Sequence, residues 1–323
     1  MRRREFIIGL GGASLVLPNV AAGQAPRMLR VGTANVQPRS APNWVAFERR
    51  LAELGYSEGR NFAFDYVQIP NPEAWDALYR EVVARKPDIV VAAGPEASLK
   101  SARRAAGTLP IVMIAVDFDP IARGHVVSLA KPGGAITGVY FQNAELAAKH
   151  LQLIKEVMPD LATVGVLWDG PSADYWAALQ AAAPNFGVRL RGIELVKRPY
   201  DYAAALAGLA PGDRRFIIAQ SSPFFFLDRD ALAQEAIRHR MALMTQLREG
   251  VAVGGLLSYG AGLAEMWGLA ANYVDRIAKG AAPADLPVQQ PTKFELALNL
   301  KTAKSIGIDI PPAILARADE VIE

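Results

Sequence analysis

Residues 111–140, IVMIAVDFDPIARGHVVSLAKPGGAITGVY, determine how the chain is organised. The stretch opens with the apolar run Ile111–Val116, which is too short for a helix and has the Ile and Val content of a buried strand. A polar and aromatic loop over 117–120 follows, and after the break at 131–134 a second strand is predicted over 136–140. Ligands of open α/β sheets collect outside the carboxyl ends of the strands, so the loop is a predicted wall of a binding cleft.

A series of strands and helices precedes this stretch. Strands are predicted over 29–33, 62–68 and 89–93, and helices over about 43–54, 72–85 and 96–106, the second with Pro72 in its first turn. With the strand at 111–116 they form a βαβαβαβ series, which is typical of a parallel doubly wound sheet.

A second series of the same kind follows. Its strands are predicted at 163–168, 188–195, 216–219, 242–245 and 254–258, with helices near 143–157, 173–183, 202–209 and 229–240. A long amphipathic helix over 263–278, a Pro-rich connection over 281–291, an alternating segment over 294–300 and short helical turns near 301–305 and 312–316 complete the chain. The predicted fold class is α/β, with two doubly wound, Rossmann-like lobes joined by a hinge of several strands.

The first 25 residues have the pattern of a secretory signal. Three arginines at 2–4 precede a modest apolar run over 7–17 and then small residues through Ala25. The order Arg3-Arg4-Glu5-Phe6-Ile7 fits the core of a twin-arginine signal, and an ordinary Sec signal is the open alternative. The run is too short and Gly-rich to span a bilayer, and no comparable segment follows, so the mature protein is expected to be soluble.

Composition excludes several classes of protein and site. The chain has 323 residues, which suits two domains, and a formal charge of +3, of which three arginines and Glu5 in the signal account for +2. The remaining +1, without a basic cluster, argues against a nucleic-acid binder. The absence of cysteine excludes disulfides, thiolate metal sites, a Cys nucleophile and a lipidated Cys, so an exported protein is expected free in the periplasm.

Catalytic signatures are absent from the sequence. It contains no P-loop, no Gly-x-Ser-x-Gly elbow and no His-Glu-x-x-His motif. Its three histidines, His125, His150 and His239, fall in separate predicted elements, where solvated or packed side chains are expected. We therefore expect no metal site and no cofactor.

Several side chains near predicted strand ends are candidates for the cleft. Asp117 and Asp119 could act as paired carboxylates, whereas the structural alternative has Asp119 capping the turn at Pro120 and Asp117 lining the cleft. Arg248 could hold a carboxylate, or instead form an ion pair with a carboxylate such as Glu249. The aromatic candidates could sandwich a flat or apolar ligand or merely fill lobe edges; they are Tyr140, Phe141, Trp168, Phe224, Phe225 and Tyr259.

Three segments carry a resemblance to a known family. They are Asp119-Pro120-Ile121 through Gly138, Arg248-Glu249 with the run at 254–260, and residues 282–323, which include Gln290-Pro291-Thr292-Lys293-Phe294-Glu295-Leu296 and Arg317-Ala318-Asp319-Glu320-Val321-Ile322. With these motifs the chain resembles the solute-binding proteins of ABC transporters that have the type I periplasmic binding fold, in the group related to tryptophan/tyrosine uptake. It departs from that pattern at His125, Lys131, Ala135 and Gly250 and in the loop at 34–42.

The resemblance implies one lobe over 29–138 plus 261–287 and another over 139–260 plus 288–323. It implies a small-molecule solute, an ABC permease and ATPase at the inner membrane as partners, no cofactor, no nucleic acid and a monomer. The predicted ligand-binding residues are Asn35, Gln37, Gly94, Pro95, Glu96, Asp117, Tyr140, Phe141, Trp168, Ser221, Phe224, Arg248 and Tyr259.

The sequence therefore predicts a periplasmic binding protein that closes two lobes around a small apolar or aromatic solute, which could bear a carboxylate. Two alternatives stay open. One is a periplasmic enzyme that uses Asp117 and Asp119, and the other is a sensor subunit that passes ligand occupancy to a membrane kinase.

Overall fold

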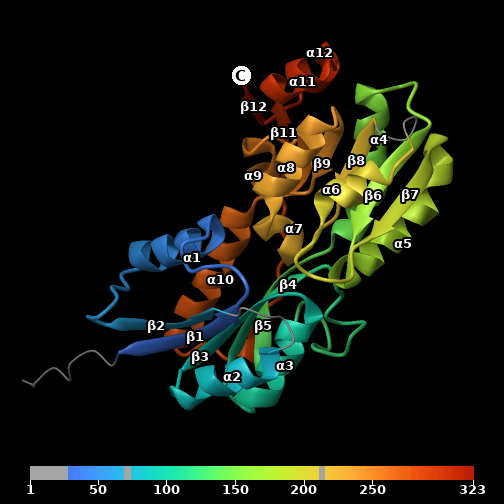
Figure 1. Ribbon diagram of the computed structural model, residues 1–323. Helices are drawn as coiled ribbons and strands as arrows, with labels where there is room; N and C mark the ends of the chain where they lie inside the picture. Colours follow the sequence, from blue (N-terminus) through green and yellow to red (C-terminus); the bar gives the residue numbers. More distant parts are fainter. Residues whose placement is uncertain (1–27, 69–73, 211–214) are drawn as a thin grey trace, which may run out of the picture.

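The computed structural model describes residues 28–68, 74–210 and 215–323. The predicted signal at 1–25 and Pro72 lie outside the described residues. Figure 1 shows two α/β bodies, each built around its own sheet. No helix in the described ranges is long and apolar enough to cross a membrane.

The first sheet has five strands in the order β2-β1-β3-β4-β5, and all their pairs are parallel. Its strands are β1 (Leu29–Asn35), β2 (Phe62–Gln68), β3 (Ile89–Gly94), β4 (Ile111–Val116) and β5 (Ile136–Phe141). The helices α1 (Pro42–Glu53), α2 (Trp75–Ala84), α3 (Glu96–Ala106) and α10 (Leu263–Ala278) cover it. Because helices lie on both faces, β3 and β4 are buried at almost every position.

Helix α10 comes late in the chain but packs on the first sheet beside α1 (Figure 1). Its Trp267 ring meets the buried Trp44 ring of α1 edge to face, with the centroids 6.0 Å apart. The first lobe is thus completed by a segment that returns from the second sheet.

The second sheet has the order β12-β11-β10-β9-β8-β6-β7 and is parallel except between β10 and β11. Its strands are β6 (Thr163–Trp168), β7 (Arg189–Glu194), β8 (Phe216–Ala219), β9 (Ala242–Thr245), β10 (Leu257–Ala261), β11 (Phe294–Asn299) and β12 (Glu320–Ile322). Its α-helices are α4 (Ala147–Val157), α5 (Ala173–Ala182), α6 (Tyr202–Ala207), α7 (Pro223–Leu227), α8 (Arg229–Arg238), α9 (Arg248–Ala252), α11 (Leu300–Ile306) and α12 (Pro312–Leu315). Short 3-10 turns are η2 (Asn143–Leu146), η3 (Gly170–Ser172), η4 (Ala183–Phe186) and, beside the first sheet, η6 (Pro283–Asp285).

Within the described residues the chain crosses between the sheets after β5, after β10 and before β11. Just before the last crossing, Gln289 pairs with β5: its N–H donates to the Gly138 carbonyl, and its own carbonyl accepts from the Tyr140 N–H. Beside the crossings the Phe294 ring lies 6.1 Å from Phe141 and 6.0 Å from Tyr259. We call these three rings the hinge cluster.

The predicted strands and long helices match the structure closely, but the strand expected at 254–258 begins later, at Leu257. Gly254 instead lies just after α9, with its N–H donating to the Val251 carbonyl and a φ of +122° that suits glycine. The short elements α7, α9 and β12 were not expected, because three to five residues carry too little periodicity to indicate a helix or strand.

Candidate functional site

Two adjoining cavities lie between the lobes, beyond the carboxyl ends of β1, β3 and β4 and of β8 in the second sheet. One has a volume of about 480 Å³ and the other about 70 Å³. Both are lined by Val36, Trp75, Pro95, Val116, Asp117, Pro171 and Pro223. We call the two cavities together the cleft. The cleft lies outside the carboxyl ends of the strands, where doubly wound α/β proteins bind their ligands.

The cleft walls are mainly apolar and aromatic. Trp75 and Phe224 line the larger cavity, and Trp75, Phe226 and Trp267 line the smaller one. The indole nitrogen of Trp267 is buried without a hydrogen-bond partner. Such walls can hold a flat or apolar body and offer it few polar contacts.

Two amide side chains lie at the carboxyl end of β1, at the cleft, and they make different contacts. Asn35 is engaged within the protein, since its Nδ2 donates to the Ala93 carbonyl at 3.3 Å and its Oδ1 accepts from the Gln37 N–H at 3.0 Å. The side-chain Oε1 of Gln37 is buried without a partner. Asn35 therefore shapes the loop and leaves the Gln37 amide available to a ligand.

Asp117 ends β4 with a left-handed backbone, at φ 63°. Its carboxylate accepts hydrogen bonds from the Asn143 N–H at 2.7 Å and from Asn143 Nδ2 at 3.3 Å, and so ties the first sheet to the crossing after β5. Burial raises the pKa of this carboxyl to about 6, although hydrogen bonds from Ser221 and Asn143 act in the opposite direction. Asp117 thus lines the cleft and also positions the crossing.

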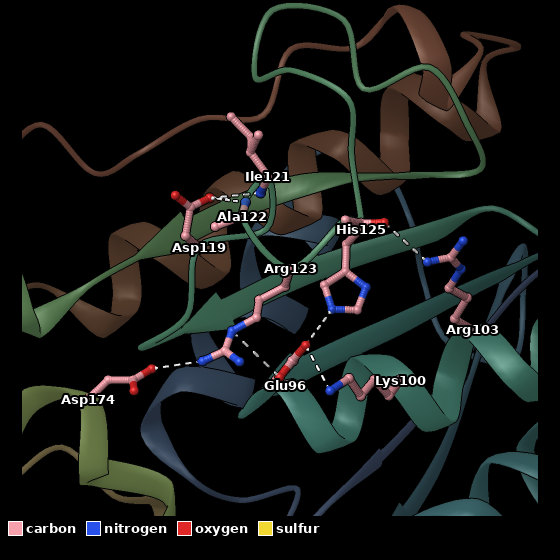
Figure 2. Close-up of polar contacts among 10 residues, drawn as sticks. Glu96, Lys100, Arg103, Asp119, Ile121, Ala122, Arg123, His125 and Asp174 are labelled. Carbon is pink, nitrogen blue, oxygen red and sulfur yellow. Dashed lines mark hydrogen bonds and ion pairs between the residues drawn. The ribbon is translucent and has the colours of Figure 1, made fainter.

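Asp119 caps the turn at Pro120. Its Oδ1 accepts from the N–H groups of Ile121 and Ala122 at 2.7 and 3.1 Å, as Figure 2 shows. This confirms the capping interpretation. Because Asp119 is engaged in the turn, the geometry does not support an acid/base pair with Asp117.

Glu96 opens α3 at the cleft, and the side chains of Lys100, Arg123 and His125 surround its carboxylate (Figure 2). His125 Nε2 and Lys100 Nζ each lie 3.0 Å from Oε1, and Arg123 Nε lies 3.9 Å from Oε2. Burial alone would raise the pKa of Glu96, but the hydrogen bonds from Lys100 and His125 outweigh it and hold the pKa below its usual value. We call these four residues the Glu96 cluster.

Arg123 also joins the two lobes. Its Nη2 donates to Oδ2 of Asp174, in α5 of the second lobe, at 3.2 Å (Figure 2). Both side chains line the larger cavity. In the part of the chain that the structure describes, Arg123 is the one cation among the residues lining the cleft, and it already has two acidic partners.

The remaining two histidines have structural surroundings. His150 is fully buried; its Nε2 lies 2.6 Å from the Tyr259 carbonyl and its Nδ1 contacts the Tyr175 hydroxyl. A carbonyl only accepts, so Nε2 carries the proton and Nδ1 accepts from Tyr175. Burial lowers the pKa of His150 to about 4, which keeps the ring neutral. His239 Nε2 lies 3.9 Å from Glu235. Among the described residues, no three His, Cys, Asp or Glu side chains form a group that could hold a metal ion.

The structure brings many of the predicted ligand-binding residues together at the cleft. They are Asn35, Gln37, Gly94, Pro95, Glu96, Asp117, Ser221 and Phe224. All lie at the last residue of a strand, in the loop after it or at the start of the next helix, where the strand pattern places a ligand.

The predicted aromatic walls Tyr140, Phe141, Trp168 and Tyr259 do not line the cleft. Tyr140 packs in the core of the first lobe, while Phe141 and Tyr259 belong to the hinge cluster. Trp168 stacks on Trp176, with centroids 6.0 Å apart, beside the edge strand β7. Each ring packs against a neighbouring ring or the core, and Tyr259 lies in the middle of β10 and not at its end.

The expected position of Arg248 is also corrected. It begins α9 with its side chain 50% exposed, and it pairs with Glu320 of β12 at 3.2 Å and more weakly with Glu249 at 3.9 Å. Its guanidinium does not line the cleft, so it is not the anion-binding group that we expected.

Several residues in and beside the cleft were missed. Trp75, Pro171, Phe226 and Trp267 lie on helices or 3-10 turns, whose exposure to a cleft no local pattern indicates. Gln220 and Gln246 come directly after β8 and β9 and could have been found by the strand-end rule that identified Ser221.

Known proteins resemble the chain over most of its length. The "Tyrosine-binding protein" of Clostridioides difficile (strain R20291) is 24% identical over 273 residues, which are 81% of this chain and 75% of that protein. A conserved domain protein from Vibrio cholerae is 26% identical with a TM-score of 0.82, and an ABC domain in complex with L-Trp from Streptococcus pneumoniae is 23% identical with a TM-score of 0.79. Each structural match covers 91% of this chain and 100% of the other.

The family model described as ABC transporter substrate binding protein matches residues 45–322. This span contains both sheets apart from β1, and all of the cleft apart from Asn35, Val36 and Gln37. The chain therefore belongs to the family of ABC transporter substrate-binding proteins.

Proposed function

We propose that the protein captures a small organic solute with an aromatic or apolar body in the cleft and presents it to an ABC permease. The observation that carries this proposal is the cavity of about 480 Å³ between two hinged lobes. Its volume lies within the usual range for small-ligand sites, and Trp75, Phe224 and several prolines provide the apolar surface that an aromatic body would contact.

Closure of the lobes would couple binding to transport. The cleft takes residues from both lobes, so a ligand makes its full set of contacts only when the lobes are together. A ligand that binds the closed form more tightly shifts the population toward it, and a permease can then distinguish loaded from empty protein. The Arg123–Asp174 bond between the lobes would support the same closed form.

The relatives support an aromatic ligand. One is named as a tyrosine-binding protein, and another was solved with L-Trp. We infer that aromatic amino acids or related aromatic acids are the first candidates for this chain. The departures at His125 and in the loop that holds Asn35 and Gln37 alter the cleft wall, so we propose the class of ligand and not one member of it.

We infer that the protein acts by binding without turnover. Asp117 is hydrogen-bonded to Asn143 and Asp119 caps a turn, which supports structural roles for the two carboxylates that an enzyme could have used. We further propose that the protein works as a monomer in the periplasm after removal of the signal.

A thermal-shift screen against aromatic amino acids, other aromatic acids, aromatic amines and aliphatic acids tests the proposal. A ligand at a hundred times its dissociation constant adds about 2.7 kcal/mol to the free energy of unfolding, which is readily visible. We expect aromatic compounds to stabilise the protein and to be recovered unchanged. Stabilisation by aliphatic acids alone would contradict the aromatic class, and conversion to a product would contradict binding without turnover.

A further inference from the structure

A third cavity of about 40 Å³ opens beside the cleft within the second lobe. It shares Ser221, Ser222, Phe226 and Leu247 with the smaller cleft cavity. We call it the recess; its other lining residues are Ala219, Gln220, Phe225, Arg229, Leu232, Leu243, Thr245, Gln246 and Gly250. A solute whose body lies against Phe226 could therefore extend one small group into it.

Three polar side chains of the recess, Gln220, Gln246 and Arg229, have buried atoms without a hydrogen-bond partner, whereas the Ser222 and Thr245 hydroxyls are hydrogen-bonded within the protein. Gln220 is 2% exposed, and neither its Nε2 nor its Oε1 has a hydrogen-bond partner. Gln246 is 3% exposed and its Nε2 makes no hydrogen bond of good geometry, but its amide lies near enough to the Tyr175 hydroxyl to act on that group as a donor and lower its pKa. Buried polar atoms nearly always have partners, so atoms without one at a cavity indicate a missing ligand or water.

Sheet topology brings the two glutamines together. Strands β8 and β9 are parallel neighbours, and each glutamine is the first residue after its strand. Parallel strands end at the same edge of a sheet, so both amides lie in the same wall of the recess.

Arg229 adds a positive charge to this wall. Its Nη1 donates to the Phe226 carbonyl at 2.8 Å and its guanidinium lies 4.7 Å from the Phe226 ring, which fixes its orientation. Its Nε is buried without a hydrogen-bond partner; the Asp230 carboxylate forms an ion pair with it at 4.0 Å, beyond hydrogen-bond range, and the Glu249 carboxylate interacts with it electrostatically. The guanidinium is thus positioned with a free donor at the recess.

The free groups identify the chemistry that the recess can bind. Unpartnered donors are Nε of Arg229 and Nε2 of Gln220 and Gln246, against one unpartnered acceptor, Oε1 of Gln220. Turning the Gln220 amide over does not change this count, because both of its ends are free. An excess of donors beside a guanidinium matches a small, planar, negatively charged acceptor.

We propose that the recess binds the carboxylate of the solute, with Arg229, Gln220 and Gln246 as donors. This rests on the proposed function, since the body of the same solute lies in the cleft. The inference replaces Arg248, which is engaged with Glu320, by Arg229 as the anion-binding arginine.

Calorimetric titration of the purified protein with L-tryptophan and L-tryptophanamide tests the proposal, because the two probes differ only at the carboxylate. We expect the acid to bind at least about tenfold more tightly than the amide, since hydrogen bonds to charged groups are worth more than neutral ones. In Arg229→Met the acid should lose about ten- to a hundredfold in affinity and the preference for acid over amide should disappear. Gln220→Met should lower the affinity for the acid by a smaller factor.

Arg248→Ala is the matched control, because it removes an arginine outside the recess, and its acid-to-amide ratio should equal that of the wild type. Melting temperatures without ligand verify that each variant is folded. An unchanged ratio in Arg229→Met would overturn the proposal and leave only water in the recess. If the screen above identifies another acid, that acid and its amide replace the tryptophan pair. If aromatic amines bind but no acid does, the carboxylate site is wrong and the proposed function stands, whereas the absence of any aromatic ligand contradicts both.

Discussion

The Glu96 cluster and the recess lie on opposite sides of the cleft and treat polar groups differently. In the Glu96 cluster a partly buried carboxylate has Lys100, His125 and Arg123 around it, and Arg123 has Asp174 as a further partner. In the recess the amide of Gln220 has no partner at all. The Glu96 carboxylate has partners without a ligand, and of the four described residues of its cluster only His125 has a buried atom, Nδ1, without one, whereas in the recess both ends of the Gln220 amide are unpartnered.

This difference distinguishes polar groups that stabilise the folded protein from polar groups that are free to bind a solute. An unsatisfied buried polar group costs about 1–3 kcal/mol, which a folded protein tolerates where a ligand can supply the missing bonds. A partnered group instead stabilises the fold, and its removal leaves its neighbours unpaired. Substitutions on the two walls should therefore change stability in opposite directions.

The largest expected effect concerns two partnered groups elsewhere, His150 and Asp117. The pKa of His150 falls from 6.5 in the unfolded chain to about 4 in the fold, so the unfolded state binds more protons between these values. Its contribution, about 3 kcal/mol, is present above pH 6.5 and is lost as the pH falls to 4. In His150→Gln, whose amide can still donate to the Tyr259 carbonyl, the free energy of unfolding should fall less steeply on acidification.

The pKa of Asp117 shifts so that its contribution to stability changes with pH in the opposite direction, and it serves as the comparison. Its pKa rises from 3.8 to about 6 in the fold, so the folded state binds more protons and stability from this group increases as the pH falls from 6 to 4. In Asp117→Asn the free energy of unfolding should therefore fall more steeply on acidification than in the wild type. Denaturant unfolding at several pH values measures the free energy of unfolding of both variants. The same pH dependence in the two variants would contradict the opposite pKa shifts of His150 and Asp117.

Removal of the Glu96 carboxylate should destabilise the Glu96 cluster and with it the folded protein. In Glu96→Gln the side chains of Lys100, His125 and Arg123 lose their common carboxylate partner, and we expect the free energy of unfolding to drop by about 1–3 kcal/mol at neutral pH. Chemical denaturation without ligand measures this. A variant as stable as the wild type would show that the cluster does not stabilise the fold.

A substitution in the recess should change the stability of the protein in the other direction. Gln220→Met keeps a side chain of similar size and removes two unsatisfied buried atoms, so stability without ligand should be unchanged or rise by up to about 1 kcal/mol. Solute affinity should fall in the same variant. A clear loss of stability would mean that Gln220 is already hydrogen-bonded in solution, and it would remove the contrast between the two walls.

The smallest effect is expected for the Arg123–Asp174 bond, since both side chains are about half exposed, at 47% and 60%. Exposed ion pairs contribute little, so Asp174→Asn should weaken solute binding by about two- to fivefold, and less so at high salt. Asp160→Asn is the matched control, because Asp160 pairs with Arg215 at the surface within one lobe. Equal effects of the two variants on affinity would show that the Arg123 bond does not favour closure.

The strand pattern was sufficient to predict the fold, because buried parallel strands leave short Ile- and Val-rich runs such as 89–93 and 111–116. It also located the cleft residues that lie at or just beyond strand ends, Gly94 and Ser221 among them. The hinge cluster could not be predicted, since Phe294 reaches Phe141 and Tyr259 through a crossing that brings distant segments together.

Arg248 shows why a charged candidate is harder to place than a strand. Its partner Glu320 belongs to a three-residue strand that no periodicity indicates, so the ion pair is visible only in three dimensions. Gln220 and Gln246 pose the reverse difficulty. Amides have no catalytic signature, and their importance here comes from the absence of partners, which a sequence does not record.

The distribution of indoles has a practical consequence. Of the five tryptophans, Trp75 and Trp267 line the cleft, while Trp44 lies in the core and Trp168 stacks on Trp176 beside β7. Indole emission responds to local polarity and to a neighbouring aromatic ring, so the protein carries its own optical reporter of occupancy. Stopped-flow fluorescence of the unlabelled protein would then follow how fast a solute enters and leaves, with Trp75→Phe and Trp168→Phe separating the signal of the cleft from that of the far edge.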